Sequence, residues 1–140
     1  MHDVLIIGSG VIGMSIARQL SQSHLDIAIV DRDIPGMHAS YKAGGMLGAQ
    51  NEFTTDSELF QLAVASRSLF PELSDALYHE TGIDIEFQQS GLIKMASSTK
   101  DVERLTQQYD FLRSKDPSVE LLSDDALFNL SNGHIEPVSY

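Results

Sequence analysis

The chain has 140 residues, with 20 acidic against 9 basic side chains, no cysteine and 42% apolar residues, so its formal net charge is −11 with histidine neutral. The length suits one compact domain or part of a larger protein, and the charge repels phosphate backbones and anionic lipid, which argues against nucleic-acid and membrane partners. Because cysteine is absent, disulfides and thiolate sites are excluded, and because the first residues carry no export signal, we expect a cytoplasmic protein.

The first thirty residues predict a strand, a helix and a second strand. Residues 4–7 (VLII) and 27–30 (IAIV) are continuous apolar runs, typical of strands buried on both faces of a parallel sheet. Between them the helical spacing places four residues on the inner side, namely Ile12, Ile16, Ala17 and Leu20. A strand, helix and strand within about 30 residues require a parallel crossover. This pattern predicts a Rossmann-like α/β fold with residues 4–7 as a central strand.

A loop and a helical region are expected next. Residues 34–51 are rich in Gly, Ala, Pro and Ser, which predicts a long ordered loop with room for one short helix. Loops of this length tend to be functional. Residues 56–82 carry apolar side chains at helical spacing, and Pro71 either kinks one helix or begins a second. Gly82 is the expected stop.

The rest of the chain predicts a mixture of strands and helices. A hairpin with one solvent-exposed face is predicted next. Apolar and polar residues alternate at 83–87, a turn is expected at 89–91, and an apolar run follows at 92–96. The elements expected after it are a helix capped by Ser98 or Thr99 that runs to about residue 113, a short strand at 119–122 and a short helix at 123–130.

The Gly-x-Gly-x-x-Gly pattern of Gly8, Gly10 and Gly13 lies between the first strand and the helix. In dinucleotide-binding folds the first glycine permits a tight turn, the second lets the backbone approach a pyrophosphate, and the third lets the helix pack on the strand. The free amides at the start of the helix, around Val11 and Ile12, then face the anion.

An acid follows the second strand. Asp31 lies 21 residues after Gly10 (31 − 10), where a carboxylate can accept both hydroxyls of an adenosine ribose. Such an acid suits NAD or FAD, whereas the neighbouring Arg32 could hold the 2′-phosphate of NADP. The glycine motif is compatible with NAD, NADP and FAD, so it does not distinguish between them.

A second segment distinguishes flavin from nicotinamide: Ser40 and the run AGGMLGA at residues 43–49. From the first strand through the glycine loop to this run, the chain resembles the amino-terminal part of the D-amino-acid oxidase family of flavoproteins, most closely the branch that serves thiamine biosynthesis. Residues 66–73 and 91–93 also carry the resemblance, which covers nearly all of the chain.

The resemblance implies roles for individual residues. The glycine loop would cradle the FAD pyrophosphate, Asp31 would hold the ribose, and the hydroxyl of Ser40 would contact the phosphates. Residues 45–47 would run beside the isoalloxazine ring, with Met46 on its substrate side. The expected cofactor-binding residues are Gly8, Gly10, Val11, Ile12, Gly13, Asp31, Arg32, Ser40, Ala43, Gly44, Gly45, Met46 and Leu47.

The resemblance also implies an activity and a domain division. The parent enzyme would transfer a hydride from glycine or another small amine to FAD, reduce oxygen to hydrogen peroxide, and form a homo-oligomer. Residues 1–82 would begin the FAD-binding domain, 83–132 would begin an α+β substrate domain, and 133–140 would return to the first domain. The arginine that clamps the substrate carboxylate would lie outside this chain, so we expect the 140 residues alone to be inactive.

Two alternatives remain open: a nucleotide-binding domain of an NAD(P)-dependent dehydrogenase, and a nucleotide-binding module without activity. We expect no catalytic acid or base in this chain and no metal site. The five histidines, which lie at positions 2, 24, 38, 79 and 134, show no ligand spacing.

Overall fold

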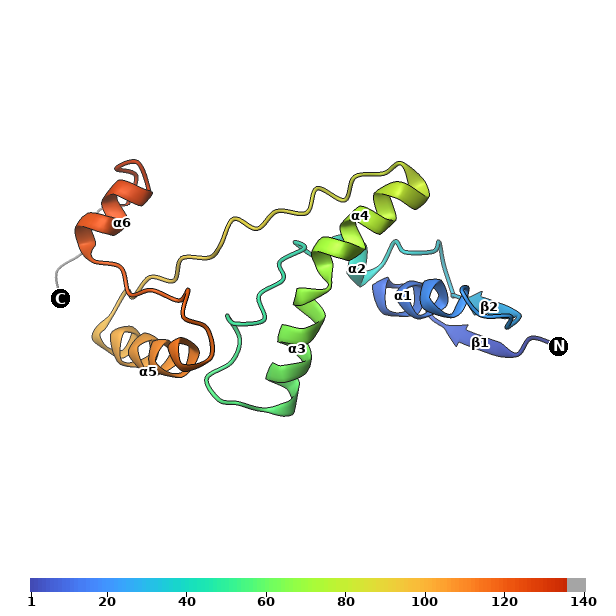
Figure 1. The fold of residues 1–140 in the computed structure, drawn as a ribbon, viewed down its shortest axis with the longest axis horizontal. Coiled ribbons are helices and arrows are strands. Elements are labelled where there is room, and N and C mark those ends of the chain that lie inside the picture. The colour runs from blue at the N-terminus through green and yellow to red at the C-terminus, as the bar shows by residue number, and fades with distance from the viewer. Residues whose placement is uncertain (136–140) are drawn as a thin grey trace. The chain divides into compact units, whose positions relative to one another are not determined.

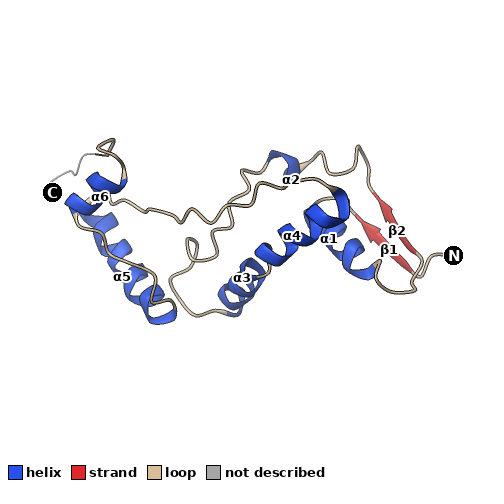
Figure 2. Cartoon of the chain, turned by 45° about the horizontal axis from the view of Figure 1, so that its top comes forward, coloured by secondary structure: helices blue, strands red, loops and turns tan. Residues whose placement is uncertain are grey.

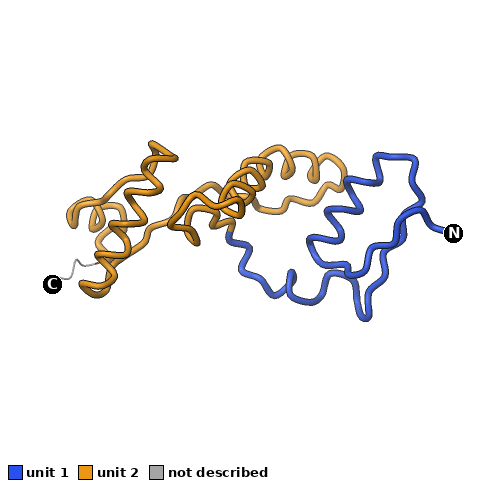
Figure 3. The backbone as a smooth tube through the Cα atoms, turned by 90° about the horizontal axis from the view of Figure 1, so that it is seen from below, with its two compact units in different colours: residues 1–46 blue, residues 47–140 orange. Residues whose placement is uncertain are grey.

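The structure is a computed structural model that describes residues 1–135. The chain divides into two compact units, residues 1–46 and the chain from residue 47 onward (Figure 3). The domain boundary predicted at 82/83 falls inside the second unit and stays a prediction. The predicted return to the first domain at 133–140 lies mostly outside the described residues. Among the described residues, no helix is long and apolar enough to cross a membrane.

The first unit is a strand–helix–strand fold followed by a short helix (Figure 1). Strand β1 (Val4–Ile7) pairs in parallel with β2 (Ile27–Val30), in a register that sets Val4 opposite Ile27. Helix α1 (Val11–Leu20) makes the crossover, and α2 (Ala39–Lys42) is the short helix within the predicted loop. The predicted parallel crossover unit is confirmed.

The sheet of the first unit is covered differently from the prediction. Helix α1 contacts both strands (Figure 2), and Val4 and Ile6 are half-buried. Leu5 and Ile7 are 57% and 84% exposed. A single crossover helix covers one face of a two-stranded sheet, so the expectation that residues 4–7 are buried on both faces is wrong for the described chain.

The inner face of α1 also differs from the prediction. Gly13, Ala17 and Leu20 are half-buried, whereas Ile12 is 74% exposed and Ile16 is also exposed. The contact of Gly13 with the end of β1 sets the rotation of the helix, because a Cβ there would lie 2.0 Å from the carbonyl oxygen of Gly8. Residues four and seven positions further along share that face. Ile12 and Ile16 therefore point away from it.

The second unit is largely helical. Its helices are α3 (Glu58–Ser68), α4 (Phe70–Thr81), α5 (Thr99–Lys115) and α6 (Asp124–Leu130). The hydroxyls of Ser57, Ser98 and Ser123 cap α3, α5 and α6 by accepting the amide three residues further on.

Pro71 lies in the first turn of α4, so it begins a second helix, one of the two predicted outcomes. Gly82 ends that helix in the left-handed region, at φ 71°, and its amide donates to Tyr78 O at 2.8 Å. The predicted stop at Gly82 is therefore confirmed.

The predicted hairpin is wrong. Residues 83–97 form one extended trace between α4 and α5 (Figure 1), and they contain no strand. The side chain of Asp84 accepts the amide of Glu86 at 2.8 Å, and Glu86 has a φ of 55°. Such an Asx turn competes with strand pairing and bends the run. The strand predicted at residues 119–122 is likewise absent from the structure of that segment.

The second unit buries few side chains. Phe60 of α3 and Leu112 of α5 are buried, and the ring of Phe60 meets those of Phe53 and Phe111 edge-on at 5.6 and 5.1 Å between centroids. These contacts join the segment after Ala49 to α3, and α3 to α5. The same segment accepts the hydrogen bonds described below.

Candidate nucleotide site

The turn between β1 and α1 forms the base of the candidate site. Gly8 has a φ of +105°, which favours glycine, and its amide donates to Val30 O at 2.8 Å. Gly10 caps α1 without a side-chain hydrogen bond. The first amides of the helix lack intrahelical partners, so they can serve an anion. The close contact at Gly13 fixes this end of the helix against the strand.

Ser40, a residue of α2, lies next to the first residue of α1. Its Oγ accepts the amide of Val11 at 2.9 Å, and a Cβ on Gly10 would approach the same oxygen to 3.2 Å. Helix α2 therefore brings a hydroxyl directly to the second glycine and the first helical amide. This arrangement suits a phosphate, and the contact of Ser40 with a phosphate stays a prediction.

Asp31 is held by Ser9, the residue between the first two glycines. The Ser9 amide and hydroxyl donate to Asp31 Oδ2 at 2.7 and 2.6 Å, and the Ser9 Oγ accepts the Gly36 amide at 3.2 Å. The Ser9 hydroxyl, followed by its amide, holds the pKa of the Asp31 carboxyl well below its usual range. The second oxygen, Oδ1, accepts a longer bond of 3.4 Å from the Asp33 amide.

Ser9 is the residue of this site that sequence reasoning missed. It stands at the variable position of the glycine motif, where the pattern specifies no side chain. The signal available in the sequence is a small polar residue between two glycines. Its partner is 22 residues away, and the pairing follows from the parallel register of β1 and β2.

The other residues predicted to bind the cofactor make fewer contacts with the glycine turn than Ser40 and Asp31 do. The Ala43 amide donates to Ser40 O at 3.4 Å at the end of α2, and the Arg32 side chain is exposed. Gly45 has a φ of 72°, and a Cβ on Gly44 or Gly45 would meet nothing within 4 Å. Met46 is 84% exposed, and Leu47 begins the second unit.

The groups that the first unit brings together fit a dinucleotide. They are the first amides of α1, the Ser40 hydroxyl that accepts one of them, the close contact of helix and strand at Gly13, and an ionised acid directly after the second strand. These groups match the diphosphate and the ribose that the sequence motif predicts. Among the described residues, no group of three or more His, Asp or Glu could hold a metal ion.

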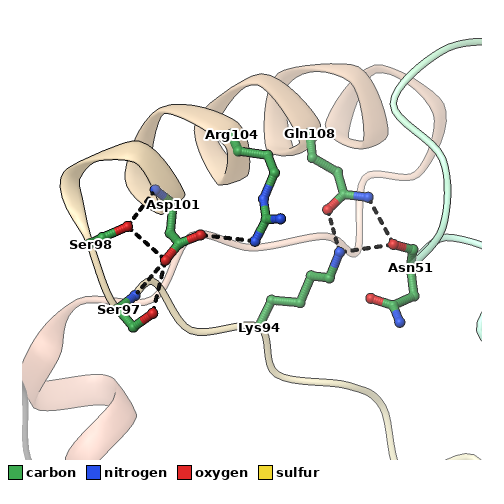
Figure 4. Close-up of polar contacts among 7 residues, drawn as sticks. All are labelled: Asn51, Lys94, Ser97, Ser98, Asp101, Arg104 and Gln108. Carbon is green, nitrogen blue, oxygen red and sulfur yellow. Dashed lines mark hydrogen bonds and ion pairs between the residues drawn. The ribbon is translucent and has the colours of Figure 1, made fainter.

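A second polar cluster lies in the second unit (Figure 4). We call it the Gln108 clasp: the side chains of Gln108 and Lys94 and the backbone carbonyls of residues 50, 51 and 53. Gln108 is 4% exposed, and its Nε2 donates to those carbonyls at 3.3, 3.1 and 2.8 Å. Its Oε1 accepts Lys94 Nζ at 2.6 Å, and Lys94 Nζ also donates to Asn51 O at 2.8 Å.

The clasp and its neighbours fasten the segment after the glycine run to α3 and α5. Arg67 donates to Gln50 Oε1 at 2.6 Å, and Gln50 Nε2 donates to Asp116 Oδ2 at 2.6 Å. Burial, and then the charge of Arg104, lower the pKa of the Lys94 ammonium. The sequence predicted no role for the side chains of Gln50, Lys94 and Gln108, because nothing in their local pattern distinguishes them from solvated polar positions.

Comparison with known proteins finds one family model and several relatives that agree with one another. The family model of FAD dependent oxidoreductases matches residues 3–138. Glycine oxidase of Geobacillus kaustophilus strain HTA426 is 42% identical over 122 residues, which cover 87% of this chain and 32% of the relative. Glycine oxidase of Bacillus licheniformis is 35% identical over 129 residues, which cover 92% of this chain and 34% of the relative.

A solved structure is also similar. The crystal structure of glycine oxidase from Geobacillus kaustophilus has a TM-score of 0.87 and 40% identity, over 91% of this chain and 35% of that one. The chain thus spans about a third of the length of the curated relatives it matches.

Proposed function

The chain belongs to the family of FAD dependent oxidoreductases, and from this premise we propose that the whole protein is an oxidase of glycine or another small amine. The observation that carries the proposal is the arrangement of the Gly8–Gly13 turn, the ionised Asp31 and Ser40 in one unit. The similarity to glycine oxidases along most of the chain supports the choice of substrate class.

The proposed reaction breaks the C–H bond at the α-carbon of the amine. FAD, when bound, supplies the acceptor for the hydride. The imine that results takes up water and releases ammonia and a carbonyl product. Oxygen finally takes up the two electrons and the proton of the hydride, together with the proton that the amine nitrogen loses, and leaves as hydrogen peroxide. We place this chemistry in the cytoplasm, within thiamine biosynthesis and in a homo-oligomer.

The residues of this chain would bind and orient the cofactor. The amides that follow Val11 in the first turn of α1 and the Ser40 hydroxyl would hold the diphosphate. Oδ1 of Asp31, which accepts the longer bond from the Asp33 amide, would also accept a ribose hydroxyl. Residues 45–47 would run beside the isoalloxazine ring, with Met46 facing the substrate. Hydride transfer from a neutral amine requires positioning rather than proton abstraction, so we assign no catalytic acid or base.

The test uses the full-length protein. We expect it to purify with flavin absorbance and to produce hydrogen peroxide when glycine is added. Asp31→Ala should weaken FAD binding, whereas the matched variant Asp3→Ala, on the opposite end of the sheet, should retain it. A colourless protein that NADPH saturates would instead establish the dehydrogenase alternative. A flavoprotein that yields no peroxide with small amines would retain the cofactor assignment and overturn the substrate assignment.

A further inference from the structure

Ser9 makes more hydrogen bonds than its place in a glycine loop requires. It is 3% exposed, and its hydroxyl both donates to Asp31 Oδ2 and accepts the Gly36 amide. It therefore joins three segments of the first unit: the glycine turn, the end of β2 and the loop that follows β2.

The geometry of Asp31 depends on this residue. Both Ser9 donors reach the same carboxylate oxygen, Oδ2, at 2.7 and 2.6 Å. Two short bonds to one oxygen restrict rotation of the carboxylate. The Oδ1 atom, whose bond from Asp33 is 3.4 Å long, is left to accept a ligand hydroxyl.

The Ser9 amide is also committed by this arrangement. It donates to Asp31, so it does not serve a phosphate. The Val11 amide is likewise committed, to Ser40 Oγ, so the donors that remain for the diphosphate are the next amides in the first turn of α1 and the hydrogen of the Ser40 hydroxyl. Ser9 thus separates the ribose side of the glycine turn from its phosphate side.

Resting on the proposed function, we infer that Ser9 is a positioning residue of the FAD site, which acts through Asp31 to fix the carboxylate that receives the adenosine ribose. A hydroxyl is needed at this position for two reasons. It supplies a donor to a charged acceptor, the stronger class of hydrogen bond. It also gives the Gly36 amide its acceptor, which keeps the loop after β2 close to the turn.

The experiment is a double-mutant cycle in the full-length protein with Ser9→Ala, Asp31→Asn and both together, read as the Kd for FAD by fluorescence titration of the apoprotein. We expect Ser9→Ala to weaken binding about tenfold, the loss of one hydrogen bond to a charged group. In the Asp31→Asn background the same change should cost less than about threefold, because the residue acts through the carboxylate. The control Ser21→Ala removes a hydroxyl that donates to Arg18 O at 2.7 Å, at the other end of α1, and should leave the Kd unchanged.

Each outcome is decisive. Binding of FAD by the wild-type protein tests the proposed function, whereas the difference in Kd between variants tests the role of Ser9. Equal losses in the two backgrounds, or a Ser9→Ala Kd within twofold of wild type, would overturn the inference and leave the flavin assignment intact. If Ser9→Ala fails to fold, Ser9→Gly removes the same hydroxyl and must show the same coupling to Asp31. Wild-type protein that does not bind FAD would overturn both proposals.

Discussion

At Gly13 the packing of α1 on β1 leaves no space for a side chain. A Cβ there would meet the Gly8 carbonyl oxygen at 2.0 Å and the Ile6 side chain at 3.3 Å. The nearest atom belongs to the backbone, so the helix itself must move to relieve the contact. The third glycine of the motif is therefore a packing requirement in this chain, as its position in the sequence predicts.

We expect Gly13→Ala to destabilise the protein by about 1–3 kcal/mol, the usual cost of overpacking. Urea unfolding followed by circular dichroism measures the change. Gly44→Ala is the matched control, since a Cβ at Gly44 meets nothing within 4 Å. Equal unfolding midpoints for the two variants would contradict the packing argument.

A second prediction concerns the charge of Asp31. Its pKa is lowered in the folded state, chiefly by the Ser9 hydroxyl and then by the Ser9 amide. A carboxyl with a depressed folded pKa stabilises the fold above its unfolded pKa of about 3.9, and this contribution is lost as the pH falls through the folded value. In a carbon-detected NMR titration we expect Asp31 to stay ionised at about pH 3.5.

In the same titration Ser9→Ala should move the midpoint of Asp31 upward toward the ordinary range, whereas Ser21→Ala should leave it in place. A wild-type Asp31 that titrates near the ordinary aspartate value would show that the Ser9 hydrogen bonds do not favour the ionised form.

At the scale of elements, α5 organises the second unit through one buried amide. The Gln108 clasp ties the carbonyls of residues 50, 51 and 53 to the middle of the helix. These carbonyls belong to a segment without helix or strand, so the side chain supplies the hydrogen bonds that a sheet or helix would otherwise provide.

We expect Gln108→Leu to lower the free energy of unfolding by about 1–3 kcal/mol, because it leaves the segment's carbonyls without their buried donor. Gln107→Leu is the control, since Gln107 is its exposed neighbour on the same helix. Hydrogen exchange should rise in residues 50–53 of the Gln108 variant and stay unchanged in the control. A variant with wild-type exchange in this segment would contradict the clasp.

The sequence predicted the helices better than the strands, for a reason visible at this scale. A capping serine, Pro71 and Gly82 act within a few residues of their own position, so helices α3 to α6 follow from local pattern. A strand needs a partner, and alternation at residues 83–87 does not supply one. In this segment the Glu86 amide donates a local hydrogen bond to the Asp84 side chain instead of pairing with another strand.

At the scale of the whole molecule, the described chain leaves much apolar surface exposed. Leu5 and Ile7 face away from α1, and the Met46 side chain in the glycine run is largely exposed to solvent. The first unit supplies the donors for a diphosphate and an acid for a ribose, whereas the segment assigned to the flavin ring has few contacts of its own.

We therefore expect the isolated 140-residue chain to bind FAD weakly or not at all, and to yield no glycine-dependent peroxide. Gel filtration with FAD followed by flavin absorbance of the protein peak measures the first, and a coupled peroxide assay measures the second. The full-length protein is the positive control. Micromolar or tighter binding by the isolated chain, or turnover above a blank without protein, would contradict the expectation.

Local sequence patterns predicted the crossover unit, the glycine turn, the serine cap of α5 and the end of α4 at Gly82, because apolar periodicity, glycine conformation and capping act between residues that are near in the chain. The tertiary structure alone decided which face of the sheet is covered, how α1 is rotated, and that Ser9 meets Asp31 and Gln108 meets residues 50–53. These last contacts join positions 22 and more than 50 residues apart. These contacts form because strand pairing and helix packing bring distant segments together, and local sequence patterns do not predict which distant residues will be in contact.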